Sequence, residues 1–314
     1  MKVLVTDGLE AEALARLKAK HDVDVIEASP NQLLDIIGGY DAVIVRGRTK
    51  VTRDVIENAA KVKVIARAGV GVDNIDVAAA TKRRIPVVNA PAASTISVAE
   101  LTIAHMLSLA RRIPQAHASL RAGKWEKKQF EGTELHGKTL GLIGSGRIGA
   151  EVAARAKAFG MRTIAYDPYL PPNVAAERGI ELTTMEAVLL DADFLSIHAA
   201  LTNETRHMIG AKQLALLKKS AYIVNCARGE IIDEAALAAA IKNGEIAGAA
   251  LDVFETEPPT GSPVLAVENT SLTPHLGAST KEAQIRVGES VAEDVLRVLA
   301  GKRPEFCVNP EVFK

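Results

Sequence analysis

The sequence has little of what would mark an extracellular or a metal-binding protein. Its only two cysteines, Cys226 and Cys307, form neither a disulfide framework nor a metal-ligand spacing. We therefore expect no metal site, two inert thiols and a reducing compartment, the cytoplasm. The N-terminus, MKVLVTDGLEAEAL, places acidic residues where a signal peptide needs a long apolar run, so no signal peptide is expected.

Net charge and long apolar runs are also absent. The 38 Lys and Arg residues balance 38 Asp and Glu residues, so no overall field gathers nucleic acid or holds the chain at an anionic membrane. No apolar stretch approaches the roughly 20 residues needed to span a bilayer. The 314 residues are 48% hydrophobic and 24% charged, which is typical of a globular protein of about two domains.

Short, almost continuously apolar runs alternate with helical patterns at the start of the chain. This alternation predicts parallel βαβ units, and the unbroken runs predict a sheet that helices cover on both faces. We therefore predict a small doubly wound, flavodoxin-like domain. Its expected strands are residues 2–7, 23–28, 42–46, 62–68 and 86–90.

A long helix and a second series of strands follow. Ser97 and Glu100 have the spacing of a capping box, which predicts a helix from Ser97 to beyond Arg112. Six further apolar runs predict a complete dinucleotide-type sheet. They are residues 138–144, 161–167, 193–199, 221–227, 246–253 and 270–275. A last helix is expected at about residues 281–299.

The tail after this last helix contains glycine and prolines, and we predict that it returns to the first domain. The fold class is then α/β, with two doubly wound parallel-sheet domains. A Rossmann-type NAD domain, residues 95–282, is predicted to be inserted into a discontinuous substrate domain, residues 1–94 and 283–314.

Gly144, Gly146 and Gly149 form a G-x-G-x-x-G motif between a predicted strand and a predicted helix. The first glycine permits a tight turn, the second lets the backbone approach a pyrophosphate, and the third lets the helix pack closely on the sheet. Asp167 ends the next strand, where its carboxylate would bind the adenosine ribose and repel a 2′-phosphate. The motif therefore predicts NAD in preference to NADP. The competing interpretation is a structural turn with an incidental aspartate.

Three polar residues follow three different strands of the second series, where ligands of open α/β sheets bind. His275 is the candidate general acid and base for moving a hydroxyl proton, and Glu257 would fix its tautomer and stabilise the imidazolium. Arg228 offers a donor fork to a substrate carboxylate or oxyanion. Individually, each could be an ordinary surface charge, but their combination with the nucleotide turn favours hydride-transfer chemistry. Cys226 is a poor nucleophile candidate, because this chemistry needs no covalent intermediate.

Several long strings resemble one family over nearly the whole chain. These strings are ARAGVGVDNID (66–76), GLIGSGRIG (141–149), NCARGEIIDEAAL (225–237), ALDVFETEPP (250–259) and TPHLGASTKEAQ (273–284). They are similar to the D-isomer-specific 2-hydroxyacid dehydrogenases. The resemblance implies the same roles for Arg228, Glu257 and His275.

The resemblance also implies further binding residues. Asp252 would contact the nicotinamide carboxamide. Other expected cofactor contacts are Arg147, Ile148, His198, Cys226, Ala227 and Gly277, although His198 and the helical His105 could instead have local structural roles. Arg46, Arg67 and the backbone of Gly69, Val70 and Gly71 would bind substrate, with Asn74 ordering that loop.

Within the family, the likeness is strongest to members that oxidise D-3-phosphoglycerate to 3-phosphohydroxypyruvate with NAD, the first step toward serine. Arg46 and Arg67 lie at the carboxyl ends of predicted strands. If the two domains face each other across a cleft, these arginines would bind the phosphate. Glyoxylate, hydroxypyruvate or another unphosphorylated acid remains an alternative substrate. A second alternative is an NAD-sensing binding protein, similar to transcriptional corepressors. The complete set of candidate catalytic residues argues against it.

The family pattern further implies a homodimer, or a tetramer built from dimers. Its contact would involve the long helix and an arm, residues 122–130, with Trp125 as an anchor. No nucleic-acid or membrane partner is expected. Because the chain ends at Lys314, we expect no serine-sensing regulatory domain of the kind that many such dehydrogenases carry.

Overall fold

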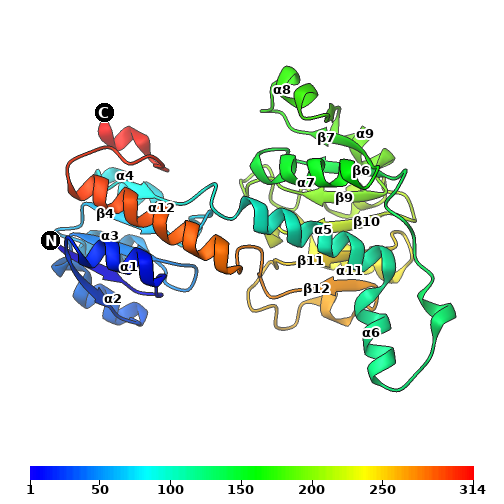
Figure 1. Ribbon diagram of the computed structural model, residues 1–314, viewed down its shortest axis with the longest axis horizontal. Helices are drawn as coiled ribbons and strands as arrows, with labels where there is room; N and C mark the ends of the chain where they lie inside the picture. Colours follow the sequence, from blue (N-terminus) through cyan, green and yellow to red (C-terminus); the bar gives the residue numbers. More distant parts are fainter. The chain divides into compact units, whose positions relative to one another are not determined.

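The computed structural model describes all 314 residues, which divide into two compact units. The first unit combines Met1–Ser94 with Ala278–Lys314, and the second is Thr95–Gly277. The sequence predicted that the chain returns from the second unit to the first between residues 282 and 283. In the structure this boundary falls between residues 277 and 278. The short segment before helix α12 (Lys281–Leu299) therefore groups with the first unit, whose sheet this helix covers (Figure 1).

The first unit is built on a five-stranded parallel sheet in the order β2-β1-β3-β4-β5. This is the flavodoxin-like order. Four of the five strands lie within the runs predicted from the sequence, and β2 begins one residue before its predicted run, at Asp22. The strands are β1 (Lys2–Val5), β2 (Asp22–Val25), β3 (Ala42–Val45), β4 (Val64–Arg67) and β5 (Val87–Val88).

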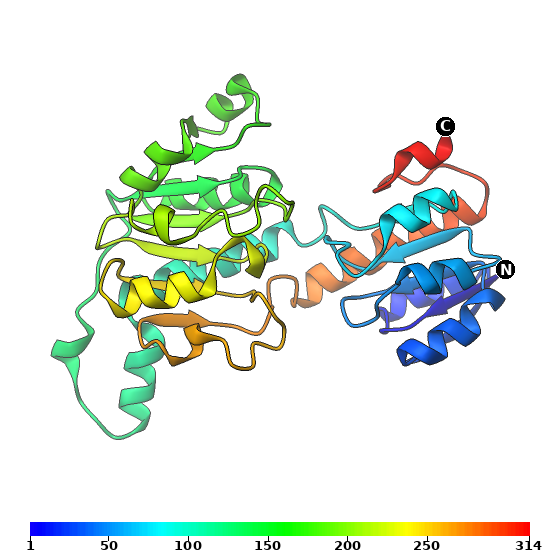
Figure 2. The ribbon, with the colours of Figure 1, turned by 180° about the vertical axis from the view of Figure 1, so that it is seen from behind.

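Helices cover both faces of this sheet. Helices α1 and α12 cover one face, and α2, α3 and α4 cover the other (Figure 2). The first two pack against Val3 and Val5 of β1, and the other three pack against Leu4. The alternation along β1 explains why the run is apolar throughout, since each face has its own core. The helices are α1 (Ala11–Lys18), α2 (Pro30–Ile36), α3 (Arg53–Asn58), α4 (Val77–Lys82) and α12 (Lys281–Leu299).

The C-terminal tail is tied to the edge of this sheet. Cys307 forms an antiparallel bridge with Val88. The side chain of Asn309, 1% exposed, accepts a hydrogen bond from Val87 N at 2.7 Å and donates to Ile85 O at 3.0 Å. Asn309 thus joins the tail to a strand more than two hundred positions earlier in the sequence.

The second unit has a seven-stranded parallel sheet in the order β12-β11-β10-β9-β6-β7-β8. All six predicted strands are present, and the sequence analysis missed only β8, which is two residues long and has no apolar run. The strands are β6 (Thr139–Ile143), β7 (Arg162–Tyr166), β8 (Glu181–Leu182), β9 (Phe194–Ile197), β10 (Tyr222–Asn225), β11 (Gly248–Leu251) and β12 (Thr270–Leu272).

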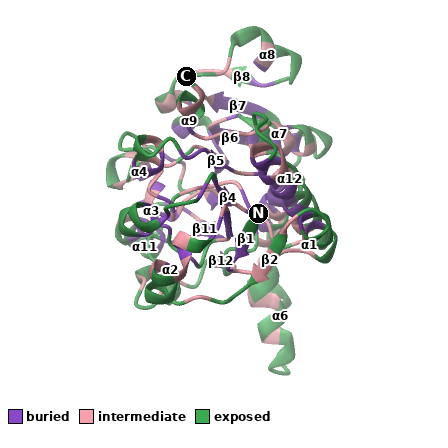
Figure 3. Cartoon of the chain, turned by 90° about the vertical axis from the view of Figure 1, so that its left-hand side faces the viewer, coloured by how far each residue is buried: buried purple, intermediate pink, exposed green.

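Helices again occupy both faces of this sheet. Helices α5, α7 and α8 share one core, and α9, α10 and α11 share the other. Figure 3 shows the buried residues concentrated on strands and on the inner sides of helices. The helices are α5 (Thr95–Arg111), α6 (Ile113–Arg121), α7 (Arg147–Ala158), α8 (Pro172–Glu177), α9 (Met185–Asp191), α10 (Ala211–Leu214) and α11 (Glu234–Lys242). None of the helices is both long enough and apolar enough to span a bilayer.

Two expectations about the long helix were wrong. Helix α5 begins at Thr95, so Ser97 lies buried inside it and does not form a capping box. The helix also ends at Arg111, because Arg112 adopts a left-handed conformation (φ 51°) and α6 starts directly after it. Helix α6 has no buried residue, and it projects from the sheet together with the following arm (Figures 1 and 2).

We predict that Asn309→Ala destabilises the first unit by about 2 kcal/mol, because the buried Val87 N–H loses its acceptor. Urea denaturation followed by circular dichroism measures this loss. The exposed Glu311, two residues away, provides the control Glu311→Ala, which should leave the free energy of unfolding unchanged. Equal stabilities of the two variants would contradict the anchoring role of Asn309.

Candidate active site

The predicted site residues of the second unit lie at one edge of its sheet. All seven strands are parallel, so their carboxyl ends share that edge. The backbone hydrogen bonds between neighbouring strands continue into the loops at this edge. Examples are the bonds from Gly144 N to Tyr166 O (2.9 Å) and from His198 N to Ile143 O (2.8 Å). The residues at this edge are Gly144, Asp167, His198, Cys226, Ala227, Arg228, Asp252, Glu257, His275 and Gly277.

The turn after β6 leaves an open cradle at a helix N-terminus. Gly144 has φ 84°, and a Cβ there would lie 2.9 Å from the carbonyl carbon of His198, so only glycine fits. A Cβ at Gly146 would meet nothing within 4 Å. Helix α7 starts at the next residue, Arg147, and Ile148 follows in its first turn. Free backbone N–H groups beside open space fit the pyrophosphate of a dinucleotide.

Asp167 ties this turn to the loop after β7. Its Oδ2 accepts a hydrogen bond from Ser145 N at 2.8 Å, and its Oδ1 accepts one from Tyr169 N at 2.9 Å. Arg178 donates to Ser145 O at 3.1 Å, and the side chain of Tyr169 is 92% exposed. The sequence analysis singled out neither Arg178 nor Tyr169, because neither lies directly at a strand end.

His198 and Cys226 are uncharged groups beside the turn and the next loop. Burial lowers the pKa of His198 to about 4, and its Nε2 lies 2.9 Å from Ser196 Oγ. Burial raises the pKa of the Cys226 thiol to about 12, which makes it unreactive at neutral pH. Neither residue therefore supplies a charge or a nucleophile to the site.

Asn225 shapes the loop that carries Arg228. Its amide nitrogen donates to Arg228 O at 2.9 Å, and its side-chain oxygen accepts from Ala227 N at 3.0 Å. Arg228 Nη1 in turn donates to Ala227 O at 2.6 Å. Asn225 is fully buried and was not predicted as a site residue, although an amide at the end of an apolar run was the available sequence signal.

Glu257 and His275 form a direct pair. His275 Nδ1 lies 2.7 Å from Glu257 Oε2, and the imidazole and carboxylate side chains are 47% and 38% exposed. Burial alone would raise the pKa of Glu257, but its hydrogen bond with His275, the Phe254 N–H and the Arg228 charge together hold it below its usual value. The geometry therefore pairs an ionised carboxylate with an accessible imidazole.

Asp252 is buried beneath this pair, 1% exposed. Its carboxylate accepts three hydrogen bonds, from Thr273 Oγ1 (2.6 Å), Leu276 N (2.7 Å) and Gly277 N (2.7 Å). The backbone that directly follows His275 is thereby held at two successive N–H groups. Thr273 was not recognised from the sequence, because a threonine at a strand end is not by itself a functional signal.

In the first unit, Arg46 is already paired with a carboxylate. Its Nη2 lies 2.9 Å from both oxygens of Glu10, while its Nε is buried without a hydrogen-bond partner. The Asn74 side chain donates to Arg46 O (2.7 Å) and Thr49 O (2.6 Å). Asn74 therefore orders the loop after β3.

The loop after β4 brings Arg67 against the glycine-rich segment. A Cβ at Gly69 (φ 153°) would lie 1.3 Å from Arg67 Nη1, so the guanidinium occupies the space that any other residue would need. Asn89 holds the same loop through a bond to Val70 O at 2.5 Å. Arg67, Val70 and Gly71 thus lie in and beside one loop after β4, and their contacts with substrate stay a prediction.

Residues 103–277 match the profile of the D-isomer specific 2-hydroxyacid dehydrogenase family, NAD binding domain. The chain belongs to this family. Its second unit is accordingly the family's NAD-binding domain. The sequence resemblance and the expected NAD cofactor are therefore confirmed.

Individual relatives agree with this membership. The chain is 56% identical to a D-3-phosphoglycerate dehydrogenase of Methanocaldococcus jannaschii, over 98% of this chain and 59% of that protein. A solved structure from Thermus thermophilus has a TM-score of 0.91 and 36% identity, and covers 98% of this chain and 100% of that one. A glyoxylate reductase from Paecilomyes thermophila has a TM-score of 0.91 and 32% identity, covering 99% of both chains. The chain spans about three-fifths of the length of the curated relatives that it matches.

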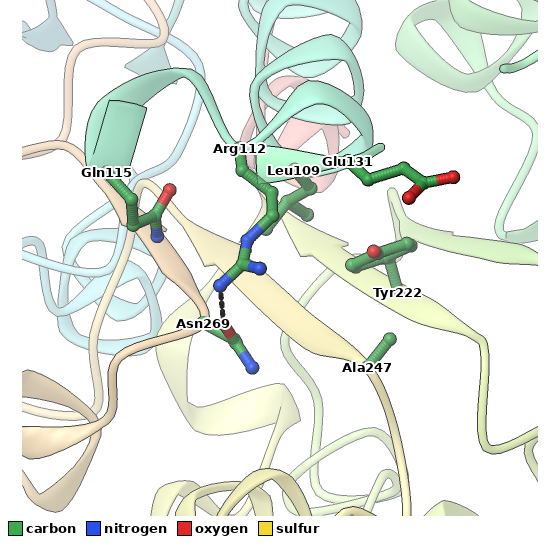
Figure 4. Close-up of a pocket in the computed structure, with 7 residues that line it drawn as sticks. All are labelled: Leu109, Arg112, Gln115, Glu131, Tyr222, Ala247 and Asn269. Atoms are coloured by element: carbon green, nitrogen blue, oxygen red, sulfur yellow. Dashed lines mark hydrogen bonds between the residues drawn. The ribbon is translucent and has the colours of Figure 1, made fainter. Parts of the chain in front are cut away.

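A polar pocket lies at the opposite, amino-terminal edge of the dehydrogenase sheet. Arg112 donates to Asn269 Oδ1 at 3.3 Å (Figure 4). It also donates to Gln129 O at 2.7 Å, which links the body of the domain to the arm. The residues that line the pocket are Leu109, Arg112, Gln115, Glu131, Tyr222, Ala247 and Asn269. Because the pair of His275 and Glu257 lies at the carboxyl edge, this pocket is separate from the candidate active site.

We predict that His198 makes the cofactor-free protein less stable in mild acid. Its folded pKa, about 4, lies below the unfolded value of 6.5, so the unfolded chain binds more protons between these values, and stability falls as the pH falls through this window. His198→Asn removes this loss. At pH 5 the wild-type Tm should therefore have dropped from its pH 7 value by about 4 °C more than the variant's. Parallel Tm curves by calorimetry would show that His198 is not buried in its neutral form.

Proposed function

We propose that this chain oxidises the hydroxyl group of a D-2-hydroxy acid with NAD, and that its substrate is D-3-phosphoglycerate. The observation that carries the proposal is the 2.7 Å pair of His275 and Glu257 at the carboxyl edge of an NAD-binding sheet. The product would be 3-phosphohydroxypyruvate, a precursor of serine. Two free thiols favour the reducing cytoplasm as the place of this activity.

The pair of His275 and Glu257 determines which ring nitrogen of His275 carries the proton. A carboxylate can only accept a hydrogen bond, so the Glu257 oxygen fixes the proton of neutral His275 on Nδ1. The other ring nitrogen, Nε2, is then unprotonated and can take the proton of the substrate hydroxyl. As that proton arrives, the carboxylate stabilises the imidazolium.

Arg228 supplies the remaining group of the site. Its guanidinium would bind the substrate carboxylate or the oxygen at which charge changes, with its loop held by Asn225. Bound NAD supplies the hydride acceptor. Gly144, Gly146 and Gly149 would hold its pyrophosphate, and Asp167 its ribose.

The phosphate is the finer part of the proposal. It is supported by the names of the curated relatives, and Arg46 and Arg67 are the proposed phosphate ligands. A second candidate, reduction of glyoxylate or hydroxypyruvate, is favoured by the glyoxylate reductase neighbour and by the Glu10 carboxylate that already holds Arg46. The two candidate functions share the same hydride-transfer chemistry. They differ only in whether the substrate carries a phosphate group.

We also propose that the chain forms a homodimer through α6 and the arm, with a tetramer built from such dimers as a further possibility. Ile113, Leu120 and Trp125 are 50%, 59% and 83% exposed, which is unusual for a row of large apolar side chains. Arg112 fixes the arm by its bond to Gln129 O and lies 5.8 Å from the Phe130 ring. A held arm with an exposed tryptophan suits a protein contact.

His275→Ala should lower kcat for D-3-phosphoglycerate about a thousandfold, because the proton acceptor is lost, while the NADH dissociation constant changes little. Absorbance of reduced nicotinamide and NADH fluorescence measure the two quantities. His207 is a matched control, since it also has φ near 50°, is 46% exposed and lies 3.3 Å from a carboxylate, Glu255. Full activity of His275→Ala, or an equal loss in His207→Ala, would rule out the mechanism.

Wild-type protein that binds NADH but turns over no 2-hydroxy or 2-oxo acid would favour a sensing function.

Arg46→Ala should raise KM for D-3-phosphoglycerate by about tenfold or more, because a charge-assisted contact to the phosphate is lost. KM for an unphosphorylated 2-hydroxy acid should change far less. Arg53, an exposed arginine of the same unit that pairs with Asp76, provides the control Arg53→Ala. Equal increases on both substrates would favour the unphosphorylated candidate.

Sedimentation of Trp125→Ser tests the dimer. The wild type should sediment as a dimer or tetramer at micromolar concentration, and the variant should dissociate at a higher concentration than the wild type. The exposed Tyr169, changed to Ser, removes a comparable aromatic away from the arm and should leave the oligomer intact. A monomeric wild type would end this part of the proposal.

A further inference from the structure

His105 is a buried histidine that the proposed chemistry does not use. It lies in the middle of α5 and is 3% exposed. Both ring nitrogens face hydroxyl groups of the neighbouring chain around β12: Nδ1 lies 3.1 Å from Ser271 Oγ, and Nε2 lies 3.0 Å from Thr273 Oγ1. Both ring nitrogens of this buried imidazole are therefore hydrogen-bonded, as buried polar groups require.

The hydrogen bonds determine the tautomer of His105. Thr273 has a single hydroxyl proton, and it donates that proton to Asp252 Oδ1 at 2.6 Å. Thr273 Oγ1 must therefore accept from His105, which places the imidazole proton on Nε2. The unprotonated Nδ1 then accepts from Ser271. Burial lowers the pKa of His105, so the neutral form that this arrangement needs is present at neutral pH.

The same chain of bonds ends at the backbone behind the catalytic imidazole. Asp252 accepts from Thr273 and also from Leu276 N and Gly277 N, the two residues that directly follow His275. His275 itself has φ 54°, a left-handed conformation that a non-glycine residue keeps only when its surroundings hold it. Asp252 is the group that holds this backbone.

We propose that His105 and Thr273 are positioning residues for His275. By fixing the Asp252 carboxylate from below, they hold the backbone after His275 so that its imidazole stays in line with Glu257. This inference rests on the proposed function, in which His275 moves the substrate proton. Neither residue touches substrate in this scheme, so the expected effect is on the rate of the chemical step and not on substrate affinity.

Thr273→Val removes the hydroxyl with little change of shape, and His105→Leu removes the imidazole that supports it. Each should lower kcat by about tenfold, because a buried polar network loses a member, with KM for the hydroxy acid changed less than about twofold. Thr273→Ser restores the hydroxyl and should restore kcat. Thr163→Val is the matched control, because the buried Thr163 Oγ1 in β7 has no hydrogen-bond partner. That variant should keep wild-type kcat.

A second readout does not depend on turnover. In protein labelled with nitrogen-15 at histidine, the two ring nitrogens of His275 should give the separate shifts of an imidazole whose proton is on Nδ1, a signal that needs no protection from solvent. Thr273→Val and His105→Leu should broaden or remove it, and Thr163→Val should not. An unchanged signal together with kcat within about twofold of wild type would overturn the positioning role, and Thr273→Val alone decides this if His105→Leu fails to fold. A wild type without dehydrogenase activity would contradict the proposed function, while the imidazole signal would still decide the role of His105.

Discussion

Parallel pairing imposes a requirement on both sheets, because every strand must end in a loop at the same edge, and the loop's backbone N–H groups need acceptors there. In both units, a carboxylate just beyond a strand supplies them. Asp7, which follows β1, accepts from Arg46 N and Thr49 N of the loop after β3. Asp167 and Asp252 do the same for the turn after β6 and the loop after β12. These side chains join neighbouring loops, so the carboxyl edge is held as a unit and not as separate turns.

Environment separates the ionisable groups at this edge into charged and uncharged members. His198 and Cys226 are neutral because burial penalises their charged forms. Glu257 is ionised because His275, a backbone N–H and the Arg228 charge outweigh its burial. The same sheet edge therefore holds two uncharged groups, His198 and Cys226, and an ionised carboxylate beside the imidazole where a proton would move.

Local pattern was sufficient for much of this structure. Continuous apolar runs predicted eleven of the twelve strands, and the glycine spacing predicted the turn at Gly144, because both signals are contained in a few adjacent residues. The missing strand, β8, is an edge strand with no apolar run. The capping box predicted at Ser97 is wrong, because α5 begins at Thr95 and Ser97 lies buried inside it. The Glu10 partner of Arg46 and the contacts of His105 with β12 join residues far apart in the sequence, and no single-sequence pattern encodes such pairs.

The first unit is assembled from two distant parts of the chain, and this affects the order in which the protein can fold during synthesis. Residues 1–94 supply all five strands, but one face of that sheet is covered in part by α12, and its edge is completed by Cys307 and Asn309. The second unit, by contrast, is continuous. It can therefore complete its core while the first unit still exposes the apolar surface of β1 and β4 that awaits α12. The segment made first is thus the one whose core is completed last, when α12 has been made.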